Sequence, residues 1–419
     1  MNQYIVTNFA YGTGPYLRTT DLAIAFNDEL EKAGRERMGI IVPWVYGEKQ
    51  KRVMLEEFAV HEKKYAGEIL LDKKLGELLR SVFYADCTYE EALRAWVKQY
   101  REVSLQAYHH FSFNFEVETL GGEKRTVDGT KISVELNRSP RIRYNVAPSY
   151  FTSFAYLGDI LERAQKVPEI AVDPELLKKG VEAANWIERI QKMRCMAWPA
   201  TFAYLKPYLR HAEHSEASLE DERIRSFANA RVLKDLRDDT EKGGRYNDEI
   251  LVPPIAPPPK PNNEEIDPGI FVTITGIPGL ERLYADAKRL GLKYYSNDTE
   301  AVPGSIHALP HIIPNTRIAL QFARSGWSSI WISMISGTPL VVPEFDSHDD
   351  PEIYFNNKSV EELGLGIVYR GQPLEEILKE TPRIKESYKK VTEVIMKRWG
   401  TLDGNRYCAK MFVEDYLKV

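Results

Sequence analysis

The stretch that decides the fold is Ile270–Leu290, which reads IFVTITGIPGLERLYADAKRL. Its first residues are apolar and β-branched, which predicts a buried strand, and a turn rich in glycine and proline follows at Thr275–Gly279. Residues 280–290 then carry apolar side chains at helical spacing, and Lys293–Ser296 can form the next strand. This β-turn-α-β unit is the building block of a parallel, doubly wound sheet.

The same pattern continues toward the C-terminus. Arg317–Phe322 predicts a strand, Gly326 a turn and Ile330–Ile335 a helix. Leu340–Val342 predicts a short buried strand, and Leu374–Val419 is largely helical.

The N-terminal half opens in the same way. A strand at Tyr4–Thr7 is followed by a glycine-rich loop at Tyr11–Pro15, a helix over Thr20–Ala33 and a strand at Gly39–Trp44. We therefore expect two similar α/β domains that face each other.

The middle of the chain differs from both ends. Phe111–Val117 and Lys131–Leu136 alternate between apolar and polar residues, which predicts an antiparallel hairpin insertion in the N-terminal domain. Val181–Met196 and Glu220–Leu236 are interpreted as helices.

The proline-rich segment Leu251–Pro268 marks a domain boundary, because proline at this density neither continues a helix nor pairs in a sheet. We predict an N-terminal α/β domain over residues 1–250, a linker over 251–268 and a C-terminal α/β domain over 269–400. A terminal helix over 401–419 should pack back toward the N-terminal domain.

The composition of the 419 residues, 43% hydrophobic and 28% charged, suits two soluble domains. The net charge of -5 without a long block of like charge excludes nucleic acid as the principal partner. No signal peptide and no membrane span is expected, although peripheral membrane contact stays open. The widely separated Cys87, Cys195 and Cys408 fit a reducing cytoplasm.

A candidate anion site lies where the third strand of the C-terminal domain meets its helix. It comprises Arg324, Ser325, Gly326, Trp327, Ser328 and Ser329. Small residues at a helix start leave backbone N–H groups free, and an adjacent arginine can hold phosphate oxygens. A diphosphate is the natural guest, and the alternative is an ordinary helix start with a surface arginine.

The segment from Arg324 to Asn356 resembles the donor-site region of the lipid-linked N-acetylglucosaminyltransferase of peptidoglycan synthesis and its relatives. The residues that match in register are Arg324, Ser325, Gly326, Gly337, Pro339, Pro343, Asp350 and Asn356. The turn that holds Gly276 matches the family's Gly-Gly-Ser-Gln-Gly turn. The loop with Gly12, Thr13 and Gly14 matches its acceptor-side loop, and Ala59–Lys260 does not align.

This resemblance implies a GT-B fold, with two facing Rossmann-like domains, and a hexosyltransferase activity. A sugar would pass from a nucleotide-diphosphate donor, UDP-linked in the resembling family, to a hydroxyl acceptor that the sequence does not identify. It implies no metal and no cofactor besides the nucleotide-sugar co-substrate.

Several positions depart from the family pattern. Ile332 stands where the family has a glutamate for the nucleotide ribose, and Glu352 and Ile353 replace two glutamines that contact the donor sugar. Tyr16 replaces a histidine that is a candidate base. These departures predict a different ribose contact and a different substrate pair.

With Tyr16 at that position, Asp21 is the first candidate for the general base, and the alternative is an acid that favours the helix dipole. Arg18 is a candidate for binding phosphate or an anionic acceptor, with a surface salt bridge as its alternative. His109 is a further catalytic candidate beside His110, and a structural role is the alternative for both histidines.

Asp346, His348, Asp349 and Asp350 could also hold a divalent ion. The resemblance assigns their loop to the sugar instead, so no metal site is predicted. Trp327 should be the more open of two tryptophans on the donor helix, whereas Trp331 should pack in the core.

Two other functions fit the same architecture. A nucleotide-sugar epimerase would need acid–base groups around the sugar in place of an acceptor pocket. A non-catalytic nucleotide-sugar-binding protein would explain the missing ribose glutamate and loop histidine. Turnover without an acceptor would favour the first, and binding without turnover would favour the second.

Overall fold

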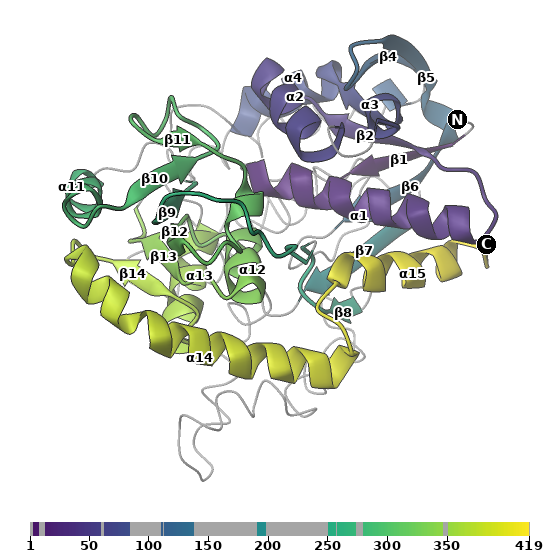
Figure 1. Cartoon of the computed structure of the whole chain (residues 1–419). Helices are drawn as coiled ribbons and strands as arrows, with labels where there is room; N and C mark the ends of the chain where they lie inside the picture. Colours follow the sequence, from purple (N-terminus) through teal and green to yellow (C-terminus); the bar gives the residue numbers. More distant parts are fainter. Residues whose placement is uncertain are drawn as a thin grey trace, which may run out of the picture. The chain divides into compact units, whose positions relative to one another are not determined.

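The computed structural model falls into two compact units (Figure 1). The structure describes residues 3–7, 13–59, 63–83, 110–111, 113–137, 191–197, 250–256, 258–273, 280–346 and 351–418. Of these, unit 1 holds the residues up to 197 together with 250–255 and 405–418, and unit 2 holds 256–404. The change of unit after Ile255 falls within the proline-rich segment.

Unit 2 is built on a parallel sheet. Its strands are β9 (Gly269–Val272), β10 (Lys293–Ser296), β11 (Ile306–His307), β12 (Ile318–Phe322), β13 (Leu340–Pro343) and β14 (Ile367–Tyr369). Their order is β11-β10-β9-β12-β13-β14, and every neighbouring pair is parallel. This is the strand order of dinucleotide-binding domains, in which ligands bind at the carboxyl ends of the strands where the order reverses. In unit 2 this switch point lies between β9 and β12.

The helices of unit 2 follow the β-α-β pattern that the sequence predicts. They are α11 (Glu281–Arg289), the 3-10 turn η3 (Pro310–Ile312), α12 (Trp327–Ser336), α13 (Pro351–Glu362) and α14 (Leu374–Trp399). α12 begins three residues before the predicted start and ends at Gly337, whose φ of 70° is a left-handed helix cap. Pro382 lies inside α14 and cannot donate to Leu378, so the hydroxyl of Thr381 donates to that carbonyl oxygen at 2.9 Å.

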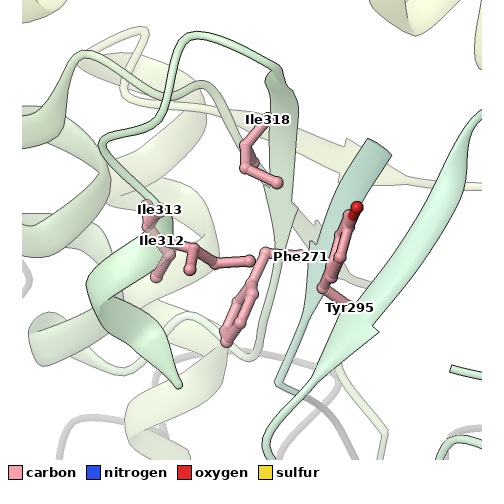
Figure 2. Packing of buried hydrophobic residues seen from close by; sticks show 5 residues of the cluster. All are labelled: Phe271, Tyr295, Ile312, Ile313 and Ile318. Carbon is pink, nitrogen blue, oxygen red and sulfur yellow. The ribbon is translucent and has the colours of Figure 1, made fainter. Parts of the chain in front are cut away.

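Figure 2 shows how part of the core of unit 2 is formed. Phe271 of β9, Tyr295 of β10 and Ile318 of β12 come from three adjacent strands. They pack with Ile312 and Ile313, in and just after η3, and all five side chains are buried. This apolar cluster fixes the sheet that carries the switch point.

Unit 1 contains a larger sheet. Its strands are β1 (Tyr4–Thr7), β2 (Gly39–Pro43), β3 (Ile69–Asp72), β4 (Asn114–Thr119), β5 (Lys124–Asp128), β6 (Ile132–Asn137), β7 (Gln191–Ala197) and β8 (Ile250–Val252). The order is β5-β4-β3-β2-β1-β6-β7-β8. Without the antiparallel pair β4–β5, the six parallel strands have the same order as those of unit 2. Two Rossmann-like domains are therefore present, one with a hairpin added at its edge.

The helical elements of unit 1 are α1 (Thr13–Lys32), α2 (Glu48–Met54), the π-helix η1 (Leu55–Ala59), α3 (Tyr65–Glu68), α4 (Lys73–Phe83), the 3-10 turn η2 (Gly129–Lys131) and α15 (Gly404–Tyr416). Although α15 ends the chain, it packs within unit 1. The hydroxyl of Tyr416 donates to Gln3 Oε1 at 2.7 Å, and its ring lies 6.0 Å from that of Phe26 on α1. Within the described residues, none of the helices is both long enough and apolar enough to cross a membrane.

Three local predictions for unit 1 are wrong. α1 starts at Thr13 instead of Thr20, because Pro15 is tolerated in a first helical turn. The hairpin is β4–β5, whereas the segment predicted as its second strand is β6, a central strand parallel to β1. Gln191–Ala197 is the strand β7 instead of helix, since its Lys-Met-Arg-Cys alternation has a period of two. The predicted helix at Glu220–Leu236 lies outside the described residues.

Candidate functional site

The start of α12 lies at the switch point of unit 2. β12 ends at Phe322, and the turn from Arg324 to Gly326 leads directly into the helix at Trp327. Gly326 is the N-cap, no side chain caps the helix, and its first turn contains no acidic residue. The backbone N–H groups and the positive end of the helix dipole therefore favour an anion here.

Buried hydrogen bonds hold this turn in place. The side-chain amide of Asn356 on α13 donates to the carbonyl oxygen of Ser325 at 2.8 Å, and the hydroxyl of Ser325 donates to the carbonyl oxygen of Ile353 at 3.4 Å. Both Ser325 and Asn356 are buried. The resemblance predicts that these two residues contact the donor. In the structure they form hydrogen bonds that hold the turn against α13.

α12 is also fastened to the sheet. The hydroxyl of Ser333 donates to Oε1 of Gln321 on β12 at 2.6 Å, and both residues are buried. Ile332 packs against the cluster around Phe271. At the position where the resembling family has its ribose glutamate, the side chain is therefore apolar, partly buried and in contact with the core.

Trp327 is only 3% exposed and Trp331 1%, so both tryptophans are buried and the predicted difference in exposure is slight. Its ring stacks against that of Trp331, with the centroids 6.2 Å apart, and Trp331 is buried as expected. Within the described part of the chain, the buried indole N–H of Trp327 has no hydrogen-bond partner. A buried donor without an acceptor is costly, and this one lies in the first turn of the candidate anion site.

Apart from Gly276, the other predicted donor-side residues lie at the turn before α12, in its first turn or in the loop and helix after β13. Arg324 is exposed at the turn, and Ser328 and Ser329 are half-buried in the first turn of α12. Gly276 and Asp350 lie outside the described residues, and Glu352 lies on α13 with a side chain that the structure does not describe.

The alternative metal site involves the loop after β13. Asp346 is exposed, and His348 and Asp349 lie outside the described residues together with Asp350. Among the residues that the structure does describe, no three of the type His, Cys, Asp or Glu cluster in a way that could hold a metal ion.

On the acceptor side, Arg18 of α1 is buried between two carboxylates. Its guanidinium donates to Asp21 at 2.5 Å and to Glu57 of η1 at 2.6 Å. Burial opposes the charge, but the two carboxylates outweigh it and raise the pKa of Arg18 above its ordinary value. Both terminal nitrogens of Arg18 are engaged within unit 1, in a buried cluster and not in the surface salt bridge that the sequence offered as the alternative.

The predicted acceptor-side loop continues into α1. Thr13 and Gly14 lie in the first helical turn, whereas Gly12 lies outside the described residues. Tyr16 is buried, and its ring lies 5.9 Å from that of Tyr46, in the loop after β2.

The structure adds one pair that the sequence did not reveal. Nε2 of His110 lies 2.8 Å from Oδ2 of Asp72, the last residue of β3. His109 lies outside the described residues. The available signal was the acid at the end of the apolar run Ile-Leu-Leu-Asp, because side chains at the carboxyl ends of parallel strands face the ligand edge of the sheet.

Comparisons with known proteins place this geometry in a wider context. Neither a protein-family model nor a curated protein sequence matches the chain. The structure is similar to that of Medicago truncatula UGT71G1 complexed with UDP-glucose, with 13% identity, 99% of this chain and 98% of the other covered, and a TM-score of 0.50. It is also similar to TcCGT1 in complex with UDP, with 10% identity, 100% of both chains covered and a TM-score of 0.53. Identities this low show the fold, and the predicted GT-B fold is confirmed.

Proposed function

We propose that the chain is a glycosyltransferase that moves a sugar from a UDP-linked donor to a hydroxyl acceptor. Unit 2 binds the donor, and unit 1 supplies the acceptor side. The observation that carries the proposal is the uncapped start of α12 beside Arg324, at the switch point of a Rossmann-like sheet.

Three features support a nucleoside diphosphate as the ligand of unit 2. The helix start offers N–H groups without a competing acid, and Arg324 adds a formal positive charge at the same turn. The buried indole N–H of Trp327 has no acceptor among the residues that the structure describes. UGT71G1 and TcCGT1 hold UDP-glucose and UDP, which favours uridine as the nucleoside.

The reaction follows from this arrangement. The acceptor oxygen attacks the anomeric carbon, the bond from that carbon to the phosphate oxygen breaks, and the diphosphate leaves with the electron pair. The helix start and Arg324 stabilise the charge that develops on the leaving group, so in this proposal no metal ion is required. Removal of one such stabilising donor typically lowers turnover by about 10²–10³-fold.

The resemblance to the lipid-linked N-acetylglucosaminyltransferase family supports the donor half of the proposal. Its matches run from Arg324 to Asn356, and two of them, Ser325 and Asn356, are joined by a hydrogen bond that shapes the turn. The acceptor remains open, because the resemblance on the acceptor side is confined to the loop around Gly12.

The proposal is tested by ligand binding to the intact protein. UDP-, GDP-, ADP- and dTDP-sugars are compared for the rise in melting temperature that each causes, because a ligand that binds only the native state stabilises it. We expect the largest rise with a UDP-sugar. If none of the four classes raises the melting temperature, the proposed function is wrong.

Arg324→Ala sharpens this test. Loss of its charge-assisted contact should weaken the binding of UDP by about 1.5–3 kcal/mol and leave the binding of uridine nearly unchanged in calorimetric titrations. Arg289→Ala is the matched control, since Arg289 is also exposed but ends α11, where it pairs with Asp286 and Glu375. Equal losses for UDP and uridine in Arg324→Ala would show that this residue does not bind phosphate.

A further inference from the structure

The pair formed by His110 and Asp72 has the geometry of an oriented imidazole. Asp72 is fully buried and His110 is 11% exposed, with Nε2 of the ring 2.8 Å from Oδ2 of the carboxylate. A carboxylate only accepts hydrogen bonds, so Nε2 carries the hydrogen and the lone pair of the neutral ring lies on Nδ1. Within the described residues, Nδ1 has no hydrogen-bond partner.

Two further contacts fix the pair. Oδ1 of Asp72 accepts a hydrogen bond from the backbone N–H of Leu75 at 3.1 Å, which holds the carboxylate at the start of α4. The ring of His110 lies 4.3 Å from that of Phe115 and 5.4 Å from that of Phe111. The imidazole is thus held by a carboxylate on one side and by aromatic rings on another.

The pair belongs to the same edge of unit 1 as the predicted acceptor-side residues. Asp72 ends β3, and its carbonyl oxygen accepts a hydrogen bond from the backbone N–H of Trp44 at 2.9 Å. Trp44 opens the loop that carries Tyr46, whose ring packs against Tyr16 at 5.9 Å. A chain of contacts therefore leads from Tyr16, at the start of α1, to His110.

We infer that His110 is the general base of the proposed transfer and that Asp72 is its positioning residue. Nδ1 takes the proton of the acceptor hydroxyl while the acceptor oxygen bonds to the anomeric carbon, and UDP leaves with the electron pair of the broken bond. Asp72 then stabilises the imidazolium. Asp21, in contrast, already accepts a hydrogen bond from a buried guanidinium.

This inference rests on the proposed function, and the test must separate the two. The alternative is a purely structural role, in which His110 serves only as the hydrogen-bond donor that the buried carboxylate of Asp72 needs. Asp72→Asn distinguishes these roles, because the amide oxygen still accepts from Leu75 whereas the amide nitrogen donates to Nε2. The hydrogen then moves to Nδ1, which loses its lone pair while the cap of α4 is kept.

The experiment compares the wild type with His110→Gln and Asp72→Asn. His311→Gln is the control, since His311 pairs with Glu264 at 3.0 Å in an exposed position of unit 2. UDP-glucose is the probe donor, and the release of UDP is measured with water as the acceptor and again with azide. Azide is already an anion and needs no base. Its rate therefore depends on donor binding and on cleavage of the sugar–phosphate bond, but not on removal of a proton. Melting temperature and the affinity for UDP are measured for each variant.

We expect His110→Gln and Asp72→Asn to lower kcat with water by about 10²–10⁴-fold, the usual contribution of a general base, with the affinity for UDP unchanged. Their rates with azide should stay close to that of the wild type. Hydrolysis by His110→Gln within about threefold of the wild type would overturn the inference and leave the proposed function intact. An equal loss with water and azide would also overturn it and assign the pair a structural role. If the wild type releases no UDP with either nucleophile, the proposed function fails and the inference fails with it.

Discussion

The two units share one strand order and differ in the charges at the carboxyl edge of their sheets. In unit 2 the helix after β12 starts without an acid in its first turn and beside the exposed Arg324. In unit 1 the helix after β1 carries Arg18, which is buried between Asp21 and Glu57, and the end of β3 carries a carboxylate paired with an imidazole. One edge therefore suits an anion, and the other suits a neutral group that gives up a proton.

This difference shows that topology and side chains make separate contributions. The order of the strands determines where a ligand can bind in each unit. The charge that each edge offers to a ligand depends on whether its arginine is exposed, as Arg324 is, or buried between two carboxylates, as Arg18 is. Substitution of Arg18 should therefore lower the stability of unit 1, whereas substitution of Arg324 should weaken ligand binding by unit 2.

The largest expected effect is that of Arg18→Met on stability. The substitution leaves two largely buried carboxylates without their cation, and breaking a buried pair in this way typically costs about 3–5 kcal/mol. Urea unfolding measures this loss of stability, and Arg324→Met serves as the control, because contacts of an exposed guanidinium contribute at most about 1 kcal/mol. A loss below about 1 kcal/mol for Arg18→Met would mean that the cluster behaves as a surface salt bridge.

A smaller effect is expected at the support of the donor helix. Ser333→Ala removes the hydroxyl that donates to the buried amide oxygen of Gln321, and an unsatisfied buried acceptor costs about 1–3 kcal/mol. Ser336→Ala is a matched control on the same helix, because its buried hydroxyl has no hydrogen-bond partner within the described residues. Urea unfolding should separate the two variants, and equal stabilities would show that the bond between Ser333 and Gln321 does not hold α12 on the sheet.

Much of unit 2 could be predicted from the sequence, because strands such as β9 and β13 are short apolar runs that directly follow a proline. The strand after Pro268, the turn at Gly326 and the left-handed cap at Gly337 are local signals that no distant contact overrides. In unit 1 the local sequence pattern and the observed strand pairing disagree. The segment Lys131–Leu136 alternates as an edge strand does, yet it pairs with β1 at the centre of the sheet, since pairing depends on residues far away in the chain.

The candidate site shows the same limit. The turn that holds Arg324 and Gly326 could be predicted, because a glycine between a strand and a helix is a local pattern. The sequence did not show that Arg18 is neutralised by Glu57, which lies 39 residues away, or that His110 meets Asp72 across 38 residues. Pairs of this kind depend on the three-dimensional arrangement, and the burial that makes them matter is not visible in a single sequence.

The smallest expected effect is that of Asp286→Asn on the pH dependence of stability. In each unit an aspartate accepts a hydrogen bond from a backbone N–H at the start of a helix. Asp72 caps α4 in the interior of unit 1, whereas Asp286 of unit 2 accepts a hydrogen bond from the backbone N–H of Leu374 at 3.0 Å, at the start of α14. This bond, followed by the hydrogen bond from Arg289, lowers the pKa of Asp286 below its ordinary value. A group whose pKa is lower in the folded state stabilises the fold at pH values above its unfolded pKa, and this stabilisation is lost as the pH falls through the folded pKa.

The urea midpoint of the wild type should therefore decline in acid more steeply than that of Asp286→Asn, whose side chain does not titrate. The comparison is a series of urea titrations between neutral pH and the acid range below the ordinary pKa of aspartate, and parallel declines would show that the cap of α14 does not depend on the charge of Asp286.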